Sequence, residues 1–410
     1  MPETATAVKA VKQSYPPTPE ILQMMETFRQ MVNDCLRAGL ANDVSSLKKL
    51  SKLCYPALSK CPIASYYKLH AISKAAGILA NRKQSIKRGY PTKTPHMKHP
   101  LLISSYGFKV ANGILKVPLG DRQYFDISLN SYVKNILSGP AVTVRSFTLA
   151  DSNTVSICYA KEVQKIECTT AFGIDRNLAN VTCGNQDRVI IFDVSQAVKV
   201  AENTRSVTRS FRRNDVRIRR MITDKYGRRR RNRVHQLVHK VSKAMVQDAK
   251  QQKAAIVFED ITFIRKLYQR GNGQGRDYRG RMNSWPFHEL KRQVEYKAAW
   301  EGVKVLTLTK GKTRGTSQFC PRCGKRLQEA ERHDAIHKRQ LLCAYCKRWM
   351  DRDVVAAMNV ARKGGEVFHR SQGPAGEAMK GNSMTTVILR VDAGKLSRRQ
   401  IDGVVHQPKT

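Results

Sequence analysis

Two pairs of cysteines constrain the fold of this chain more than any other feature. Cys320 and Cys323 form one C-x-x-C pair, and Cys343 and Cys346 form a second after a gap of nineteen residues. Thiolates at this spacing can meet on one tetrahedral zinc ion, because both cysteines of each tight turn face the same side. A structural zinc folds a small ribbon without a large hydrophobic core. The acidic segment just after the last cysteine would then stand on a rigid base.

The charge of the chain indicates a polyanionic partner. Lys and Arg total 74 against 32 Asp and Glu, so the 410 residues carry a net charge of +42. Such an excess opposes compaction unless a polyanion neutralises it, and nucleic acid is the default partner. A membrane surface is the weaker interpretation. The sequence shows no apolar run of about eighteen residues and no signal-peptide pattern, so we expect a cytoplasmic protein without membrane association.

The first 170 residues change from a strand to helices and then to β-rich segments. Residues 6–15 predict a short basic strand, and Thr18 and Pro19 are typical of a helix N-cap and of the first helical position. Helical periodicity continues through 18–86. Between about 100 and 170, short β-rich runs separated by turn residues predict a small barrel or sheet.

The next segments alternate between strands and helices. Residues 171–192 predict a β-hairpin with Asp175 on its first strand. Residues 195–250 predict two very basic helices joined by a turn at Tyr226-Gly227. The apolar run 254–258 ends in two acids, which is typical of a strand that is covered on both faces.

The last part of the chain shows less regular patterns. Residues 271–280 are rich in glycine and predict a mobile loop, which a helix over 285–301 and a buried strand over 303–308 follow. Past Gly364 the composition is polar and rich in glycine, so we expect a poorly ordered tail.

Arginines in the basic helical segment form a candidate nucleic-acid-binding surface. Runs of this kind bind polyanions nonspecifically more often than they distinguish base sequences. The candidate residues are Arg212, Arg213, Arg217, Arg220, Arg228, Arg229, Arg230 and Arg231.

Three acids stand out by their positions: Asp175 within a strand, Glu259 at the end of a strand, and Asp351 or Asp353 before a helix. Magnesium prefers oxygen ligands, and carboxylates from distant segments can converge on it at a sheet edge. Two such ions about 4 Å apart can activate water and stabilise the leaving oxygen of a phosphodiester. Each acid taken singly is also compatible with an ordinary strand end or helix start. The residues alone therefore leave the chemistry open.

Together these segments resemble the TnpB family of transposon-encoded RNA-guided nucleases, which are relatives of the CRISPR type V effectors. The resemblance covers most of residues 6–362. The segments that carry it are YPPT at 15–18, FGID at 172–175, VFED at 257–260, WPF at 285–287, EYKA at 295–298, TSQFC at 316–320, and DRD at 351–353 with Ala356, Ala357 and Asn359.

The resemblance implies an α/β and α+β multidomain fold. A RuvC-like nuclease domain of RNase H fold would carry a zinc ribbon insert, and a small β-barrel wedge domain would carry an inserted helical recognition domain. The implied domains are the first wedge strand at 1–17, the recognition helices at 18–90, the β-rich wedge at 91–170, the RuvC-like domain at 171–315, the zinc ribbon at 316–350, the final RuvC helix at 351–363 and a disordered tail at 364–410.

The resemblance also assigns site residues. Asp175, Glu259 and Asp353 would be the catalytic triad that binds two Mg²⁺ ions, with Mn²⁺ as a possible substitute, while the four cysteines bind a structural Zn²⁺. Asp353 is preferred to Asp351 because the family's catalytic acid precedes one residue and then Asn-Ala-Ala. Val355 occupies that asparagine position here, so the choice between the two acids stays open. Arg176-Asn177 stand where a more hydrophobic residue or glycine is usual.

The leading hypothesis is a prokaryotic, magnesium-dependent DNA endonuclease that uses a transposon-derived guide RNA and a short target-adjacent motif. Guide RNA and target DNA would be its partners, bound by a monomer or by a homodimer on one RNA. Base pairing would supply sequence specificity. One alternative is a catalytically silent RNA-guided repressor, against which the retention of all three acids argues. Another is a miniature CRISPR type V effector that uses a crRNA.

Overall fold

The computed structural model describes residues 3–120, 122–329, 339–370 and 386–396. The chain divides into two compact units, each described by itself below. The N-terminal unit is Thr6–Glu162, and the C-terminal unit is Val163–Thr410 together with Met1–Ala5. Within the described ranges, no helix has both the length and the apolar character needed to cross a bilayer.

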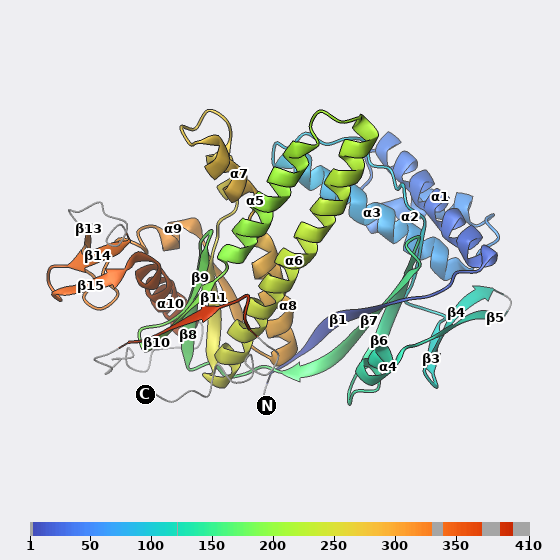
Figure 1. Cartoon of the computed structure of the whole chain (residues 1–410). Coiled ribbons are helices and arrows are strands. Elements are labelled where there is room, and N and C mark those ends of the chain that lie inside the picture. The colour runs from blue at the N-terminus through green and yellow to red at the C-terminus, as the bar shows by residue number, and fades with distance from the viewer. Residues whose placement is uncertain (1–2, 121, 330–338, 371–385, 397–410) are drawn as a thin grey trace. The chain divides into compact units, whose positions relative to one another are not determined.

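The N-terminal unit combines helices with two small sheets (Figure 1). Its helices are α1 (Pro19–Ala41), α2 (Leu47–Leu58), α3 (Ser65–Lys87) and α4 (Ser131–Leu137). One sheet has the order β1 (Thr4–Ser14), β7 (Thr154–Gln164), β6 (Thr143–Ala150) and β2 (Leu101–Ser104), and the other has β3 (Lys109–Ala111), β4 (Ile114–Gly120) and β5 (Gln123–Ser128). Thr18 is the N-cap of α1, as predicted, because its hydroxyl accepts a hydrogen bond from the Ile21 amide at 3.4 Å.

A six-stranded mixed sheet forms the centre of the C-terminal unit. Its order is β12 (Val305–Leu308), β11 (Ala254–Glu259), β8 (Thr170–Arg176), β9 (Asn180–Gly184), β10 (Arg188–Asp193) and β16 (Val387–Asp392). Strands β8, β9 and β10 pair antiparallel, whereas β11 is parallel to both β8 and β12. The strand predicted at 254–258 is confirmed. The single hairpin predicted at 171–192 is wrong, because the chain turns twice and forms three strands.

Side chains alternate between the two faces of this sheet, and different helices cover each face (Figure 1). Phe172 and Phe258 pack against α6 (Val216–Gln251) and α8 (Phe287–Glu301). Gly173 and Val257 lie on the opposite face, under α10 (Arg352–Arg370). A Cβ atom at position 173 would lie 2.1 Å from the carbonyl oxygen of Ala357, so glycine alone allows α10 to approach the strand this closely.

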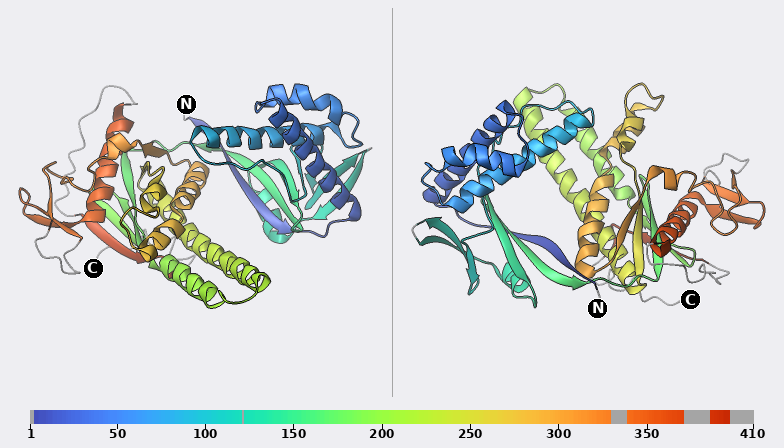
Figure 2. Two further views of the ribbon diagram at one scale, coloured as in Figure 1. Left: turned by 90° about the horizontal axis from the view of Figure 1, so that it is seen from above. Right: turned by 180° about the vertical axis from the view of Figure 1, so that it is seen from behind.

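The basic segment forms a helical hairpin of α5 (Ser195–Ser210) and α6, which extends away from the sheet (Figure 2). The predicted turn at Tyr226-Gly227 is wrong, because both residues lie inside α6 and the chain turns at 211–215. Asp215 starts α6 by accepting a hydrogen bond from the Arg217 amide at 2.7 Å. A single glycine costs a helix only about 1 kcal/mol, which the rest of a helix of 36 residues offsets.

Two predictions of irregular structure are also wrong. Helix α7 (Arg276–Ser284) begins inside the predicted glycine-rich loop. The predicted disordered tail contains the end of α10 and strand β16, which pairs in parallel with β10. Ala393 and Leu396 are buried in the core of the C-terminal unit. The remaining tail, 371–385 and 397–410, lies outside the described residues.

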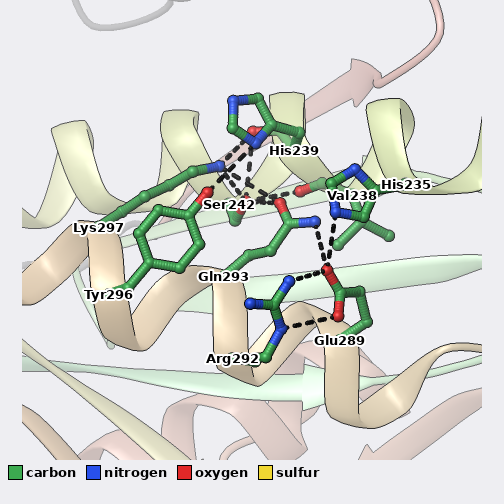
Figure 3. A network of polar contacts seen from close by, with 9 residues as sticks. All are labelled: His235, Val238, His239, Ser242, Glu289, Arg292, Gln293, Tyr296 and Lys297. Atoms are coloured by element: carbon green, nitrogen blue, oxygen red, sulfur yellow. Dashed lines mark hydrogen bonds and ion pairs between the residues drawn. The ribbon is translucent and has the colours of Figure 1, made fainter. Parts of the chain in front are cut away.

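A polar network that is buried around Lys297 joins α6 to α8 (Figure 3). Lys297 is only 7% exposed, and its ammonium group donates hydrogen bonds to the carbonyl of His239 at 2.7 Å and to the hydroxyl of Ser242 at 2.6 Å. Near the N-terminus of α8, the Glu289 carboxylate pairs with His235 at 3.0 Å and with Arg292 at 2.7 Å. Lys297 belongs to the segment at 295–298 that resembles the TnpB family, and these contacts give it a structural role.

We expect Lys297→Met to lower the free energy of unfolding of the C-terminal unit by about 2 kcal/mol, since it leaves buried acceptors on α6 without their donor. Lys291→Met on the same helix is the matched control, because Lys291 makes a partly exposed pair with Glu295 at 3.6 Å. Such a pair contributes about 0–1 kcal/mol. Thermal unfolding of both variants measures the difference, and equal shifts would contradict the structural role of Lys297.

Candidate active site

Asp175 and Glu259 lie side by side at the carboxyl ends of two parallel strands. Phe258 pairs with Ile174 in the register of β11 and β8, so the next residue of each strand reaches the same edge. Residues in register on parallel strands point to the same face. For Asp175 and Glu259 this is the face of Gly173 and therefore of α10.

Asp353 reaches the same edge from the first turn of α10 and is 4% exposed. Its Oδ2 accepts a hydrogen bond from Asn180 Nδ2 at 3.0 Å, and its Oδ1 pairs with the Arg339 guanidinium. Asp351 has a different position, since its carboxylate accepts a hydrogen bond from the Asp353 amide at 2.8 Å. Asp351 therefore caps the start of α10, while Asp353 faces the sheet.

Neutral side chains hold each of these three acids. Asn177 Nδ2 donates to Asp175 Oδ2 at 2.7 Å and to Asn180 Oδ1 at 3.3 Å, so two amides connect Asp175 to Asp353. Thr316 Oγ1 donates to Glu259 Oε1 at 2.9 Å. No sequence pattern predicts a role for these residues. The only signals are the TSQFC segment, which begins with Thr316, and the unusual residue at position 177.

The electrostatics of the cluster show that the carboxylates repel one another. Burial, then the charges of Asp353 and Glu259, raise the pKa of Asp175 to about 7. Burial also raises the pKa of Glu259 above its usual value. The repulsion between these carboxylates favours the binding of protons or of cations at this edge of the sheet.

Arg176 lies on the opposite face of the sheet from the acids. Its guanidinium is 5.1 Å from the ring centroid of Phe258 and donates to the backbone carbonyls of Glu259 at 2.6 Å and Phe287 at 3.2 Å. Burial lowers the pKa of Arg176 to about 10. This unusual residue therefore anchors the end of β11 through its main chain.

We expect Asp175→Asn to stabilise the protein in magnesium-free buffer at pH 8 but not at pH 4. The native pKa of Asp175 is about 7 and its ordinary value is 3.8, so the wild type loses stability as the pH rises between these values. The difference should reach about 2 kcal/mol, because relaxation reduces the effective penalty of a buried charge. Thermal unfolding of both proteins at the two pH values measures it. A difference that does not change with pH would contradict the prediction.

The four predicted cysteines form one compact cluster. Their sulfur atoms all lie within 4.8 Å of one another, with Cys320 to Cys346 at 3.9 Å and Cys323 to Cys343 at 3.5 Å. A tetrahedral zinc with Zn–S bonds of about 2.3 Å separates its sulfurs by about 3.8 Å. The cluster therefore fits a structural zinc. Among the described residues, these four form the only group of three or more His, Cys, Asp or Glu side chains that could hold a metal ion in this way.

The cysteine cluster belongs to a small ribbon of β13 (Gln328–Glu329), β14 (Gln340–Cys343) and β15 (Arg348–Asp351) that leads directly into α10. Val355 of α10 is buried among the ribbon's core residues. Asn359 Nδ2 donates to the carbonyls of Thr316 and Phe319, both at 2.7 Å. The ribbon also supplies the Arg339 that pairs with Asp353, so it braces α10 and contacts the acids directly.

The structure brings only some of the predicted arginines together. Arg212 and Arg220 line a shallow groove of about 440 Å³ between the end of α5 and the start of α6. Arg209 and Arg219 line the same groove. The run 228–231 lies farther along α6 and does not line it.

Comparisons with known proteins agree with these features. Residues 287–360 match the family model described as Cas12f1-like, TNB domain. A TnpB-like protein of Methanocaldococcus jannaschii is 30% identical over 204 residues, which cover 47% of this chain and 69% of that protein. A second TnpB-like protein of the same organism is 23% identical over 349 residues, covering 81% of this chain and 75% of the relative. The CRISPR-associated endodeoxyribonuclease Cas12f2 of a Micrarchaeota archaeon is 33% identical over 129 residues, covering 30% of this chain and 23% of that protein.

Proposed function

This chain belongs to the TnpB family, and from that premise we propose that it is an RNA-guided DNA endonuclease with Asp175, Glu259 and Asp353 as its catalytic acids. The observation that carries the proposal is the meeting of three acids from β8, β11 and α10 at one sheet edge. The chain positions of these acids are far apart, so their proximity is not a consequence of local sequence. The name of the Cas12f2 relative, an endodeoxyribonuclease, supports DNA as the substrate.

The domain assignment is part of this proposal. The sheet of the C-terminal unit, with three antiparallel strands followed by parallel neighbours, would be a RuvC-like domain of RNase H fold. Residues 316–350 would be its zinc ribbon. In the N-terminal unit, β1 shares a sheet with β7, β6 and β2, which supports a wedge domain with inserted recognition helices.

The residues at the sheet edge fit divalent cations. Three carboxylates offer the oxygen ligands that Mg²⁺ and Mn²⁺ prefer. Thr182, which pairs with Asp175 across β8 and β9, is fully buried, and its hydroxyl has no hydrogen-bond partner among the described residues.

The protein's own groups hold and tune the acids. Divalent cations bound there would activate water and stabilise the leaving oxygen of a phosphodiester. Asn177, Asn180 and Thr316 fix the orientation of the three carboxylates, as outer hydrogen-bond partners do at metal sites. Arg339 offsets part of the negative charge next to Asp353.

Guide RNA and target DNA are the proposed partners, and the basic α5–α6 hairpin is the proposed contact with their backbones. A net charge of +42 supports the binding of two nucleic acids. Base pairing between guide and target would supply the sequence specificity, in addition to recognition of a short target-adjacent motif. The match to a Cas12f-type model favours one alternative, a miniature CRISPR type V effector, which differs in its guide source.

The test uses the protein purified with its co-expressed RNA and a plasmid that matches the guide beside a randomised flank. We expect magnesium-dependent cutting by the wild type and a loss of about a thousandfold or more in Asp175→Ala and Asp353→Asn. Asp351→Asn is the matched control and should keep most of the activity, because asparagine also caps helices well. Cutting by Asp175→Ala at the wild-type rate would remove the proposal. Binding of the target by the wild type without any cutting would instead show a silent repressor.

A further inference from the structure

Trp285 is a buried residue whose indole N–H has no hydrogen-bond partner among the described residues. The residue is only 3% exposed and packs in the core of the C-terminal unit. Native proteins rarely leave a buried polar group without a partner, because its burial is then unfavourable. Trp285 also begins the segment at 285–287 that resembles the TnpB family, and that segment supplies no acid to the candidate active site. The indole N–H therefore requires an acceptor that the described residues do not supply.

A second donor of the same kind lines the same small cavity. The Nε–H group of Arg281, in α7, is also buried and has no partner in the part of the chain that the structure describes. Arg281 and Trp285 both line a cavity of about 10 Å³ between α5, α6 and α7. A cavity of this size holds about one water-sized atom. The Arg281 side chain is 38% exposed, so the cavity lies close to the protein surface.

The side chains that line this cavity favour a negatively charged acceptor. Arg230 of α6 is half-buried and makes no hydrogen bond or ion pair within the described ranges. The Arg281 guanidinium lies 3.7 Å from the Glu202 carboxylate, so one of the two positive charges stays uncompensated. The hydroxyl oxygen of Ser284 is the only side-chain acceptor of the lining, and this hydroxyl donates to the Arg281 carbonyl at 3.0 Å. A water molecule would need acceptors for its two hydrogens, whereas an oxyanion needs donors only.

Helix α7 is held against α5, which fixes the position of Arg281 (Figure 1). Asp277 of α7 pairs with Arg205 and with Arg209 of α5, both at 3.7 Å. A Cβ atom at Gly280 would lie 2.7 Å from a guanidinium nitrogen of Arg205, so the glycine allows the two helices to approach closely. The cavity is therefore built by packed helices and does not depend on one mobile side chain.

We propose that this cavity binds one oxygen atom of a phosphate group, which accepts hydrogen bonds from Trp285 Nε1 and Arg281 Nε while Arg230 contacts the remaining oxygens. A whole phosphate is larger than the cavity, so its phosphorus atom would stay at the mouth. The phosphate comes either from a nucleic-acid backbone, a source that rests on the proposed function, or from free inorganic phosphate. Trp285 packs in the core on the Phe258 face of the sheet, so this site is separate from the catalytic acids on the opposite face.

The first experiment measures RNA binding by the full chain. The protein is stripped of its copurified RNA at high salt and titrated with a fluorescent copy of that RNA. We expect Trp285→Phe, which lacks the N–H donor, to bind about tenfold more weakly, because hydrogen bonds to charged groups are strong. Arg230→Gln should reduce the salt dependence of the affinity by about one phosphate contact. Trp300→Phe is the matched control and should bind normally, because Trp300 lies on α8 and does not line the cavity.

The second experiment identifies the source of the phosphate. The RNA-free protein is heated in phosphate and in chloride buffers of equal ionic strength, because a ligand of the folded state raises the melting temperature. A phosphate-dependent rise that Trp285→Phe lacks and Trp300→Phe keeps would assign free phosphate. A loss of RNA affinity without such a rise would assign the nucleic-acid backbone, and both effects together would show that either source fills the site. Neither effect in Trp285→Phe would show that the cavity holds only water, and would overturn the proposal.

A direct readout uses the indole N–H group itself. Isotope-labelled tryptophan gives three indole signals in a nuclear magnetic resonance spectrum, and the Trp285→Phe variant identifies that of Trp285. We expect RNA or phosphate to shift this signal downfield and to move those of Trp300 and Trp349 less. A Trp285 signal that neither ligand moves at saturation would contradict the site.

A variant outside the core guards against loss of folding. Arg281→Lys keeps the positive charge but lacks the Nε–H group, so it should weaken RNA binding about as much as Trp285→Phe does. None of these measurements involves cleavage, so they stay informative if the nuclease proposal fails. Conversely, wild-type cutting together with normal RNA and phosphate binding by Trp285→Phe would remove only the phosphate site.

Discussion

A Gly173→Ala variant is expected to lose at least about 4 kcal/mol of unfolding free energy and to stop cutting DNA. The added Cβ atom would lie 2.1 Å from the Ala357 carbonyl oxygen and 2.5 Å from the Ala361 amide nitrogen. Both contacts are with backbone atoms of α10, which cannot rotate away as a side chain can. The helix must therefore shift or detach, and losses of this size are exceptional for one methyl group.

The same shift would move Asp353 away from Asp175, because Asp353 stands in the first turn of α10. Thermal unfolding and plasmid cutting measure the two consequences. Gly365→Ala is the matched control: a Cβ atom there meets nothing within 4 Å, and alanine favours helices over glycine by about 1 kcal/mol. A Gly173→Ala protein with the stability of the Gly365→Ala protein would contradict the close packing of α10 on β8.

Removal of Cys343 from the cysteine cluster is the second change with a large expected effect. Cys343 is fully buried, and its sulfur lies 3.5 Å from that of Cys323. Structural zinc contributes about 10 kcal/mol or more to the folding of small ribbons. We therefore expect Cys343→Ser to lose its zinc, to unfold the ribbon and to stop cutting, because Thr316 and Arg339 then no longer hold Glu259 and Asp353.

Metal analysis by mass spectrometry should find one zinc per wild-type chain and none in Cys343→Ser. Cys61→Ser is the matched control, since Cys61 is a partly buried cysteine in the N-terminal unit, apart from the cluster. The Cys343→Ser protein should still copurify with RNA, because other surfaces than the ribbon would bind the RNA. Wild-type cutting by a zinc-free Cys343→Ser protein would show that the ribbon is not needed to position the acids.

The sequence patterns predicted best those features that depend on short stretches of chain. The cysteine spacing predicted the cluster, and the run at 254–258 predicted a strand that ends in an acid. Local patterns failed where distant contacts compete with them. The Tyr226-Gly227 pair looks like a turn, but α6 continues through it because a helix of 36 residues offsets the cost of one glycine. The segment at 387–392 lies in polar, glycine-containing surroundings and was not recognised as a strand, because its pairing with β10 is a contact between distant parts of the chain.

The order of the residues was thus sufficient to predict the cysteine cluster, the acidic strand ends and the family resemblance, because each is encoded within a few neighbouring positions. Tertiary structure alone decided that Asp353 rather than Asp351 faces the sheet, that Asn177 and Asn180 connect two acids, and that Thr316 holds the third. These relations join residues separated by up to 173 positions. Their geometry follows from how β8, β11 and α10 pack. Contacts between residues so far apart in the chain produce no periodic pattern in the sequence.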